Sequence, residues 1–159
     1  MTAQLSKEEH SVLLGSDLEE KGQVNTGWSA VIASNRRPMG KSSLYKVAHH
    51  GSQTGEHQGI WADLLSPGPT SLITPFSKLT DPLPRSADRA RIKANSSRAL
   101  LTTDALVKRL KRQGATAKLL APHKVRILNP AIGAVRCRIN ASDKNATWAI
   151  EKSMEVISL

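Results

Sequence analysis

The chain is poor in aromatic residues and has a single cysteine. Aromatic side chains make up only 3% of its 159 residues, so the core has to be built from leucine, valine, isoleucine and alanine. One cysteine, Cys137, excludes an intrachain disulfide and a zinc site made of several thiolates. No apolar run approaches the roughly 18 residues of a membrane span, and the polar N-terminus lacks the apolar centre of a signal peptide. The sequence therefore predicts a cytoplasmic protein without a membrane segment.

Acidic residues are also scarce, 13 against 23 basic ones, which gives a formal net charge of +10. Such a surface attracts polyanions, and nucleic acid is the commonest partner. Basic residues cluster at 85–93 and 108–112 and are otherwise spread along the chain, as on an ordinary solvated surface. Charge alone therefore leaves nucleic-acid binding and a solvated basic surface as equal alternatives.

Short apolar segments alternate with amphipathic ones in the first two thirds of the chain. The pattern predicts strands at residues 11–14, 42–52, 69–76 and 98–105. It predicts helices at 56–68, ended by Pro67 and Gly68, and at 83–95, whereas 27–34 fits either type. This alternation favours an α/β fold for residues 1–104.

Residues 105–159 form a basic extension in this interpretation. Residues 104–115 are predicted as a short helix or an irregular insertion, and 134–140 and 147–159 as the two strands of a hairpin. Cys137 stands between Arg136 and Arg138, so the alternation predicts that it faces inward.

Polar residues follow the predicted strands at their C-terminal ends. Asp17 follows the first strand, and His49, His50 and Ser52 close the second, in "KVAHHGS". Carboxylate and neutral imidazole are ligands that Zn²⁺ and Mn²⁺ accept. Taken singly, the aspartate fits a turn or a helix cap and the histidines an exposed surface. Their order and spacing instead favour a metal site at one edge of the sheet.

These residues resemble the metallo-β-lactamase superfamily, in the branch related to the hydrolase domain of bacterial competence DNA-uptake channel proteins. The matching stretches are "SVLLGSDLEE" (11–20) and "SLYKVAHHGSQTG" (43–55), within a resemblance that spans roughly residues 8–105. The resemblance implies the C-terminal half of an αββα sandwich with a two-metal Zn²⁺ or Mn²⁺ site. It implies that Asp17 bridges the two metals.

The same resemblance assigns roles to the "HHGS" residues. His49 is the preferred metal ligand, and His50 is a substrate or supporting contact. The two roles can also be exchanged, because neighbouring strand residues point in opposite directions and the sequence does not decide which histidine faces the site. Ser52 is placed against a phosphate oxygen or the attacking water. The predicted catalytic residues are thus Asp17, Ser52 and His50, and the predicted metal ligands are Asp17, His49 and His50.

The chain lacks the His-x-(His/Asp)-x-Asp-His signature that supplies most ligands in a complete domain of this superfamily. The prediction is therefore a fragment or split part of a metal-dependent hydrolase of the phosphodiesterase or nuclease type, weak or inactive alone. An N-terminal half-domain would supply the missing ligands, and its absence is expected to leave Leu13, Val47 and Ile73 unusually exposed. The alternatives are a non-catalytic basic binding module with a vestigial metal site, and an acyl or thioester hydrolase.

Overall fold

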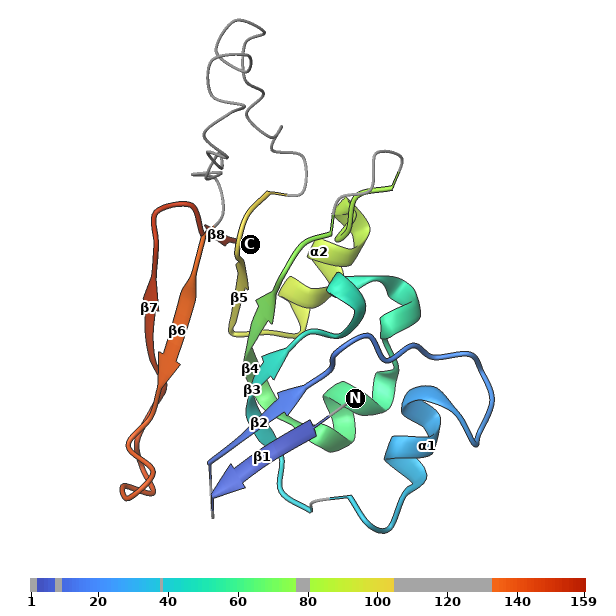
Figure 1. Ribbon diagram of the computed structural model, residues 1–159. Coiled ribbons are helices and arrows are strands. Elements are labelled where there is room, and N and C mark those ends of the chain that lie inside the picture. The colour runs from blue at the N-terminus through green and yellow to red at the C-terminus, as the bar shows by residue number, and fades with distance from the viewer. Residues whose placement is uncertain (1–2, 8–9, 38, 77–80, 105–132) are drawn as a thin grey trace, which may run out of the picture.

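The computed structural model describes residues 3–7, 10–37, 39–76, 81–104 and 133–159. Its centre is a six-stranded sheet with the strand order β1-β2-β3-β4-β5-β8, and β6 and β7 form a separate two-stranded sheet (Figure 1). The strands are β1 (Ala3–Lys7), β2 (His10–Leu14), β3 (Ser42–Lys46), β4 (Leu65–Ile73), β5 (Arg98–Leu101), β6 (Val135–Arg138), β7 (Ala149–Lys152) and β8 (Ile157–Ser158).

The four central strands, β2 to β5, run parallel to one another. Strand β1 pairs antiparallel with β2, and β8 pairs antiparallel with β5. Parallel strands place their C-terminal ends at one edge of a sheet, so the loops after β2, β3 and β4 meet there. The predicted α/β class is confirmed at this level, as a mixed fold with a mainly parallel sheet and a small antiparallel hairpin.

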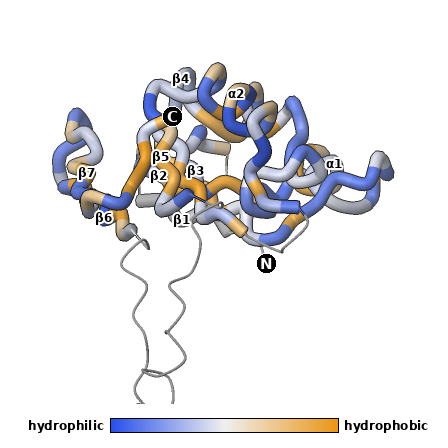
Figure 2. The backbone as a smooth tube through the Cα atoms, turned by 90° about the horizontal axis from the view of Figure 1, so that it is seen from above, coloured by the Kyte–Doolittle hydropathy of each residue, from blue (hydrophilic) through white to orange (hydrophobic). Residues whose placement is uncertain are grey.

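Helices cover one face of the large sheet, and the β6–β7 hairpin lies on the other side (Figures 1 and 2). In the part of the chain that the structure describes, no helix has the length and apolar character needed to cross a membrane. Residues 27–34, which fitted either type, form helix α1. The helical elements are α1 (Gly27–Ala33), α2 (Ser86–Ala94), the 3₁₀ turns η1 (Ala48–Gly51) and η2 (Gln53–Gly55), and the π-helical turn η3 (Ile60–Leu64).

The prediction that part of the apolar sheet face would be unusually exposed was wrong. Leu13, Val47 and Ile73 are 3%, 5% and 0% exposed. They belong to one buried cluster with residues of the helices, including Trp28 of α1 and Ile92 of α2. Helices from this same chain therefore cover the sheet face on which the three residues lie.

The helix predicted at 56–68 is reduced to the single π-helical turn η3, and the next strand begins directly at Leu65. Pro67 and Gly68 do not end an element but lie inside β4. They fall in a register shift, because Ser42 pairs with Leu65 whereas Leu44 pairs with Thr70. A proline lacks the N–H for a regular ladder and Gly68 has a φ of +61°, so both residues fit the irregular part of the strand.

The C-terminal hairpin is confirmed for β6 and β7, whose residues pair antiparallel. The segment predicted as one strand at 147–159 is instead two strands, and the second, β8, joins the large sheet beside β5. Cys137 is half-buried between two exposed arginines, as the alternation predicts. The helix or insertion predicted at 104–115 lies, after Asp104, outside the described residues. Strand β1 was not predicted, because its segment reads as a polar terminus.

Candidate functional site

The loop after β2 lies directly against the turn after β3. Gly15 N–H donates to the Lys46 carbonyl at 2.9 Å, and His49 N–H donates to the Ser16 carbonyl at 2.7 Å. A Cβ on Gly15 would stand 2.7 Å from Ala48, so only glycine allows this approach. The two loops that carry Asp17 and the histidine pair are thereby held together at one edge of the sheet, as their strand-end positions predict.

Strand β3 ends at Lys46, six residues earlier than predicted, and the chain then makes a left-handed turn. His49 has a φ of 43°, His50 a φ of 55° and Gly51 a φ of 84°. Two consecutive non-glycine residues in this region are unusual, and such strain persists where the surrounding contacts impose it, often at functional sites. The turn removes the strict alternation of a strand, so it decides how the two imidazoles point.

His50 faces Asp17. Its Nε2 lies 3.7 Å from the Asp17 Oδ1, and its Nδ1 lies 2.8 Å from the Thr74 carbonyl oxygen. Because a carbonyl only accepts, Nδ1 carries a hydrogen, and in the neutral imidazole Nε2 has a free lone pair. A lone pair and a carboxylate oxygen that face each other repel unless a cation or a proton lies between them.

His49 points to a different carboxylate, that of Glu19. Its Nδ1 lies 2.9 Å from Glu19 Oε1 and 3.1 Å from Thr54 Oγ1. The structure therefore separates the two histidines, and the preferred ligand His49 is the one that does not face Asp17. Glu19 was missed from the sequence, although the "GSDLEE" stretch places it two residues after Asp17.

Ser52 is buried and caps the start of the short turn η2. Its Oγ accepts the Thr54 N–H at 3.3 Å and lies 3.1 Å from Thr54 Oγ1. Ser52 and His49 also border an open hollow of about 530 Å³. The hydroxyl thus has a structural partner in Thr54, and neither Asp17 nor His50 lines the hollow that Ser52 borders. The remaining lining residues are Glu20, Gln53, Thr54, Glu56, Asp81, Leu83 and Arg85.

Two residues of β3, Tyr45 and Lys46, affect the electrostatics of the site. Burial raises the pKa of Tyr45 to about 12, so its phenol stays neutral and accepts the Ala48 N–H at 3.2 Å. Burial lowers the pKa of Lys46, and the charge of Asp17 opposes that shift. Lys46 therefore lies close enough to Asp17 for their charges to attract each other, although the Asp17 side chain is 78% exposed.

The basic cluster at 85–93 is largely paired within the protein. Arg85 lies 2.5 Å from Asp81, and Arg89 lies 3.0 Å from Asp104. Arg91 lies 2.6 Å from Asp88. These carboxylates offset the charge of α2, so the helix offers less attraction to a polyanion than its sequence suggests.

The other two described histidines, His57 and His10, bond to backbone groups. His57 accepts the Gly59 N–H at 3.0 Å, and His10 contacts the Asp143 carbonyl at 2.8 Å. His123 lies outside the described residues. Within the described ranges, no group of three or more His, Cys, Asp or Glu residues is placed to hold a metal ion. Asp17 and His50 are thus a pair of candidate ligands and not a complete set.

No family model, no curated protein and no solved structure matches the chain. The resemblance to the metallo-β-lactamase superfamily therefore remains a prediction from the motifs. The function has to be inferred from the geometry of Asp17, His50 and their neighbours at the edge of the sheet.

Replacing Gly51 with alanine is expected to lower the free energy of unfolding by about 3 kcal/mol. The left-handed φ of 84° costs about 1 kcal/mol in any L-residue, and overpacking adds about 2 kcal/mol. The added Cβ would stand 3.0 Å from Ile92 Cδ1 and 3.2 Å from Pro84 Cβ, both in buried residues. Urea unfolding of the purified variant measures the loss.

Gly22→Ala is the matched control for this substitution. Gly22 also has a left-handed φ, 68°, but a Cβ there meets nothing within 4 Å. It should lose only about 1 kcal/mol. Equal losses of unfolding free energy in the two variants would show that the close contacts of an added Cβ at position 51 carry no extra cost.

Proposed function

We propose that Asp17 and His50 bind a divalent cation, Zn²⁺ or Mn²⁺, and that the chain is part of a metal-dependent hydrolase. The observation that carries the proposal is the close approach of His50 Nε2 to Asp17 Oδ1, at 3.7 Å. The Thr74 carbonyl holds the other ring nitrogen, as carbonyls do behind metal-bound histidines. A cation between the two groups would turn their repulsion into two coordinate bonds. Calorimetric titration with zinc tests the proposal.

The donor set fits one divalent ion held by two protein ligands. Catalytic zinc usually has three protein ligands, so the proposal includes a second polypeptide or an N-terminal half-domain that brings the His-x-His-x-Asp-His ligands. The described chain would then be the C-terminal half of an αββα sandwich of the metallo-β-lactamase type. The mainly parallel sheet and the meeting of its strand ends at one edge support that view.

The residues of this edge have separate tasks in the proposed reaction. A bound divalent ion would supply Lewis-acid polarisation of a phosphoryl or acyl oxygen. Asp17 and His50 hold the ion, and the left-handed turn keeps His50 aimed at Asp17. Ser52 borders the hollow, so the part of a substrate held there would lie beside it.

A phosphodiester remains the proposed substrate class, with weak DNA binding by the chain alone. Oligonucleotide affinity should be low and fall steeply with added salt, since phosphate contacts release counterions. Fluorescence anisotropy at two ionic strengths measures it. Arg85 is paired with Asp81, so substituting Asp81 with asparagine should strengthen DNA binding, because the substitution frees the charge of Arg85. Affinity that does not change with salt would favour an acyl substrate.

A further inference from the structure

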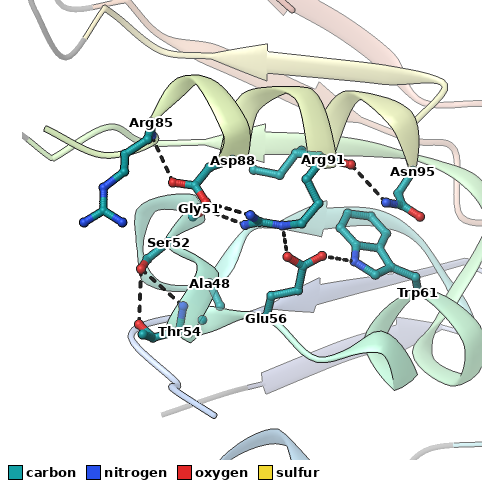
Figure 3. Close-up of polar contacts among 12 residues, drawn as sticks. Ala48, Gly51, Ser52, Thr54, Glu56, Trp61, Arg85, Asp88, Arg91 and Asn95 are labelled. Carbon is teal, nitrogen blue, oxygen red and sulfur yellow. Dashed lines mark hydrogen bonds and ion pairs between the residues drawn. The ribbon is translucent and has the colours of Figure 1, made fainter.

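Arg91 of helix α2 joins three acceptors around the left-handed turn (Figure 3). Its Nη1 lies 2.6 Å from the Asp88 Oδ1, and its Nη2 donates to the Gly51 carbonyl at 2.9 Å. Its Nε pairs with the Glu56 Oε2. The guanidinium therefore contacts the turn itself and two carboxylates, one on its own helix and one in the segment after the turn.

Both carboxylates are themselves held in place. Asp88 is 3% exposed, and its Oδ2 accepts the Arg85 N–H at 3.0 Å at the start of α2. Glu56 Oε1 accepts the Trp61 indole N–H at 2.7 Å. A planar guanidinium that pairs with two immobile carboxylates has little freedom to turn. Its third contact, with Gly51, is thus presented in one fixed direction.

The Gly51 carbonyl needs such a partner. Gly51 is buried and lies outside any strand ladder, and a buried carbonyl without a hydrogen bond costs about 1–3 kcal/mol. The other end of the turn is held by the His49 N–H, which donates to the Ser16 carbonyl at 2.7 Å. His50 lies between these two attachments. The direction of its imidazole therefore depends on both of them, together with the bond from its Nδ1 to the Thr74 carbonyl.

We propose that Arg91 is a positioning residue, which holds the His49–Gly51 turn so that His50 faces Asp17. This inference rests on the proposed function, in which Asp17 and His50 bind a cation. Arg91 contacts neither residue and acts only through the Gly51 carbonyl. Supporting residues behind metal ligands typically change metal affinity by about 10–100-fold when they are replaced.

The test compares Arg91→Met with the unmodified chain by two measurements. Hydrogen exchange without metal reports the turn through the amides of His49 and Ser52, which donate to Ser16 and His49. Zinc titration reports the site. Arg91→Met should speed exchange at these two amides but not at Val47, which bonds to Leu72 in the sheet. It should weaken zinc binding about tenfold.

Two further variants separate the contact with Gly51 from the other roles of Arg91. Lys93→Met removes one positive charge from an exposed position of the same helix and leaves the bond from Arg91 to Gly51, so exchange in the turn and zinc affinity should stay near those of the unmodified chain. Arg91→Lys keeps the charge but cannot reach all three acceptors at once, and it should fall between the unmodified chain and Arg91→Met. Arg91→Lys carries the test if Arg91→Met does not fold.

The inference is overturned if these Arg91 variants leave exchange at His49 and Ser52 unchanged, or speed exchange at Val47 equally. It is also overturned if the turn loosens and zinc affinity stays the same. If the unmodified chain binds no zinc, the proposed function fails. Selective loosening of the turn would then still support Arg91 as the residue that positions it.

Discussion

Replacing His50 with alanine is expected to weaken zinc binding by about a hundredfold or more, since removal of a direct ligand should cost at least as much as removal of a residue that supports one. The same loss is expected for Asp17→Ala. Both substitutions remove one of the two groups that face each other at 3.7 Å, Asp17 Oδ1 and His50 Nε2. Calorimetric titration of the metal-free chain measures the effect.

His49→Ala is the matched control, because it removes an imidazole from the neighbouring position of the same left-handed turn. His49 pairs with Glu19 at 2.9 Å and not with Asp17. Its removal should change zinc affinity by less than about threefold relative to the unmodified chain. This is far less than the effect of replacing even a residue that supports a metal ligand. The reverse order, with His49→Ala abolishing binding and His50→Ala leaving it intact, would return His49 to the role that the motif resemblance gave it.

The chain alone is expected to hydrolyse a phosphodiester slowly or not at all, and to gain metal-dependent activity when a first half-domain with the His-x-His-x-Asp-His ligands is added. The reason is that two protein ligands leave a catalytic ion incompletely held. The expected gain is at least about a hundredfold, within the range that ligand completion and nucleophile activation supply. Turnover of a model phosphodiester with added Mn²⁺, before and after mixing, measures it.

Asp17→Ala in the mixed sample should abolish that gain, and a substitution of Gln58 with alanine should not, because Gln58 is exposed and does not line the hollow. The burial of Leu13, Val47 and Ile73 means that the chain does not need the second half to cover that face of its sheet. Loss of activity can therefore be attributed to the site. Rapid turnover by the chain alone, insensitive to Asp17→Ala and His50→Ala, would contradict the split-site proposal.

The sequence was informative where one physical signal dominated. The apolar stretch ending at Leu14 and the amphipathic stretch around Ile92 indicated the strand β2 and the helix α2, with boundaries close to the observed ones. The hydrophobic pattern was misleading at Leu64 and Leu65, because two adjacent apolar residues fit a helix as well as a strand. It also failed at Ile157, because pairing with β5 is a long-range contact that no local pattern reports.

The site was predicted in part for the same reason. Asp17 and the histidine pair could be placed at one edge, because strand ends followed by glycine carry that information. Which histidine faces Asp17 depends on the left-handed φ angles of His49 and His50, and these are imposed by contacts from other segments. The roles of Glu19 and Arg91 arise from the same contacts. A pattern along one segment does not contain them.

The most direct test of the metal site is anomalous diffraction at the zinc edge from crystals of the chain grown with Zn²⁺. The proposal predicts a peak between Asp17 and His50, about 2.0–2.2 Å from Asp17 Oδ1 and from His50 Nε2. The two atoms, 3.7 Å apart without metal, are close enough to share an ion with little movement of the loops. A peak bound to His49 and Glu19, or none at this edge of the sheet, would contradict it.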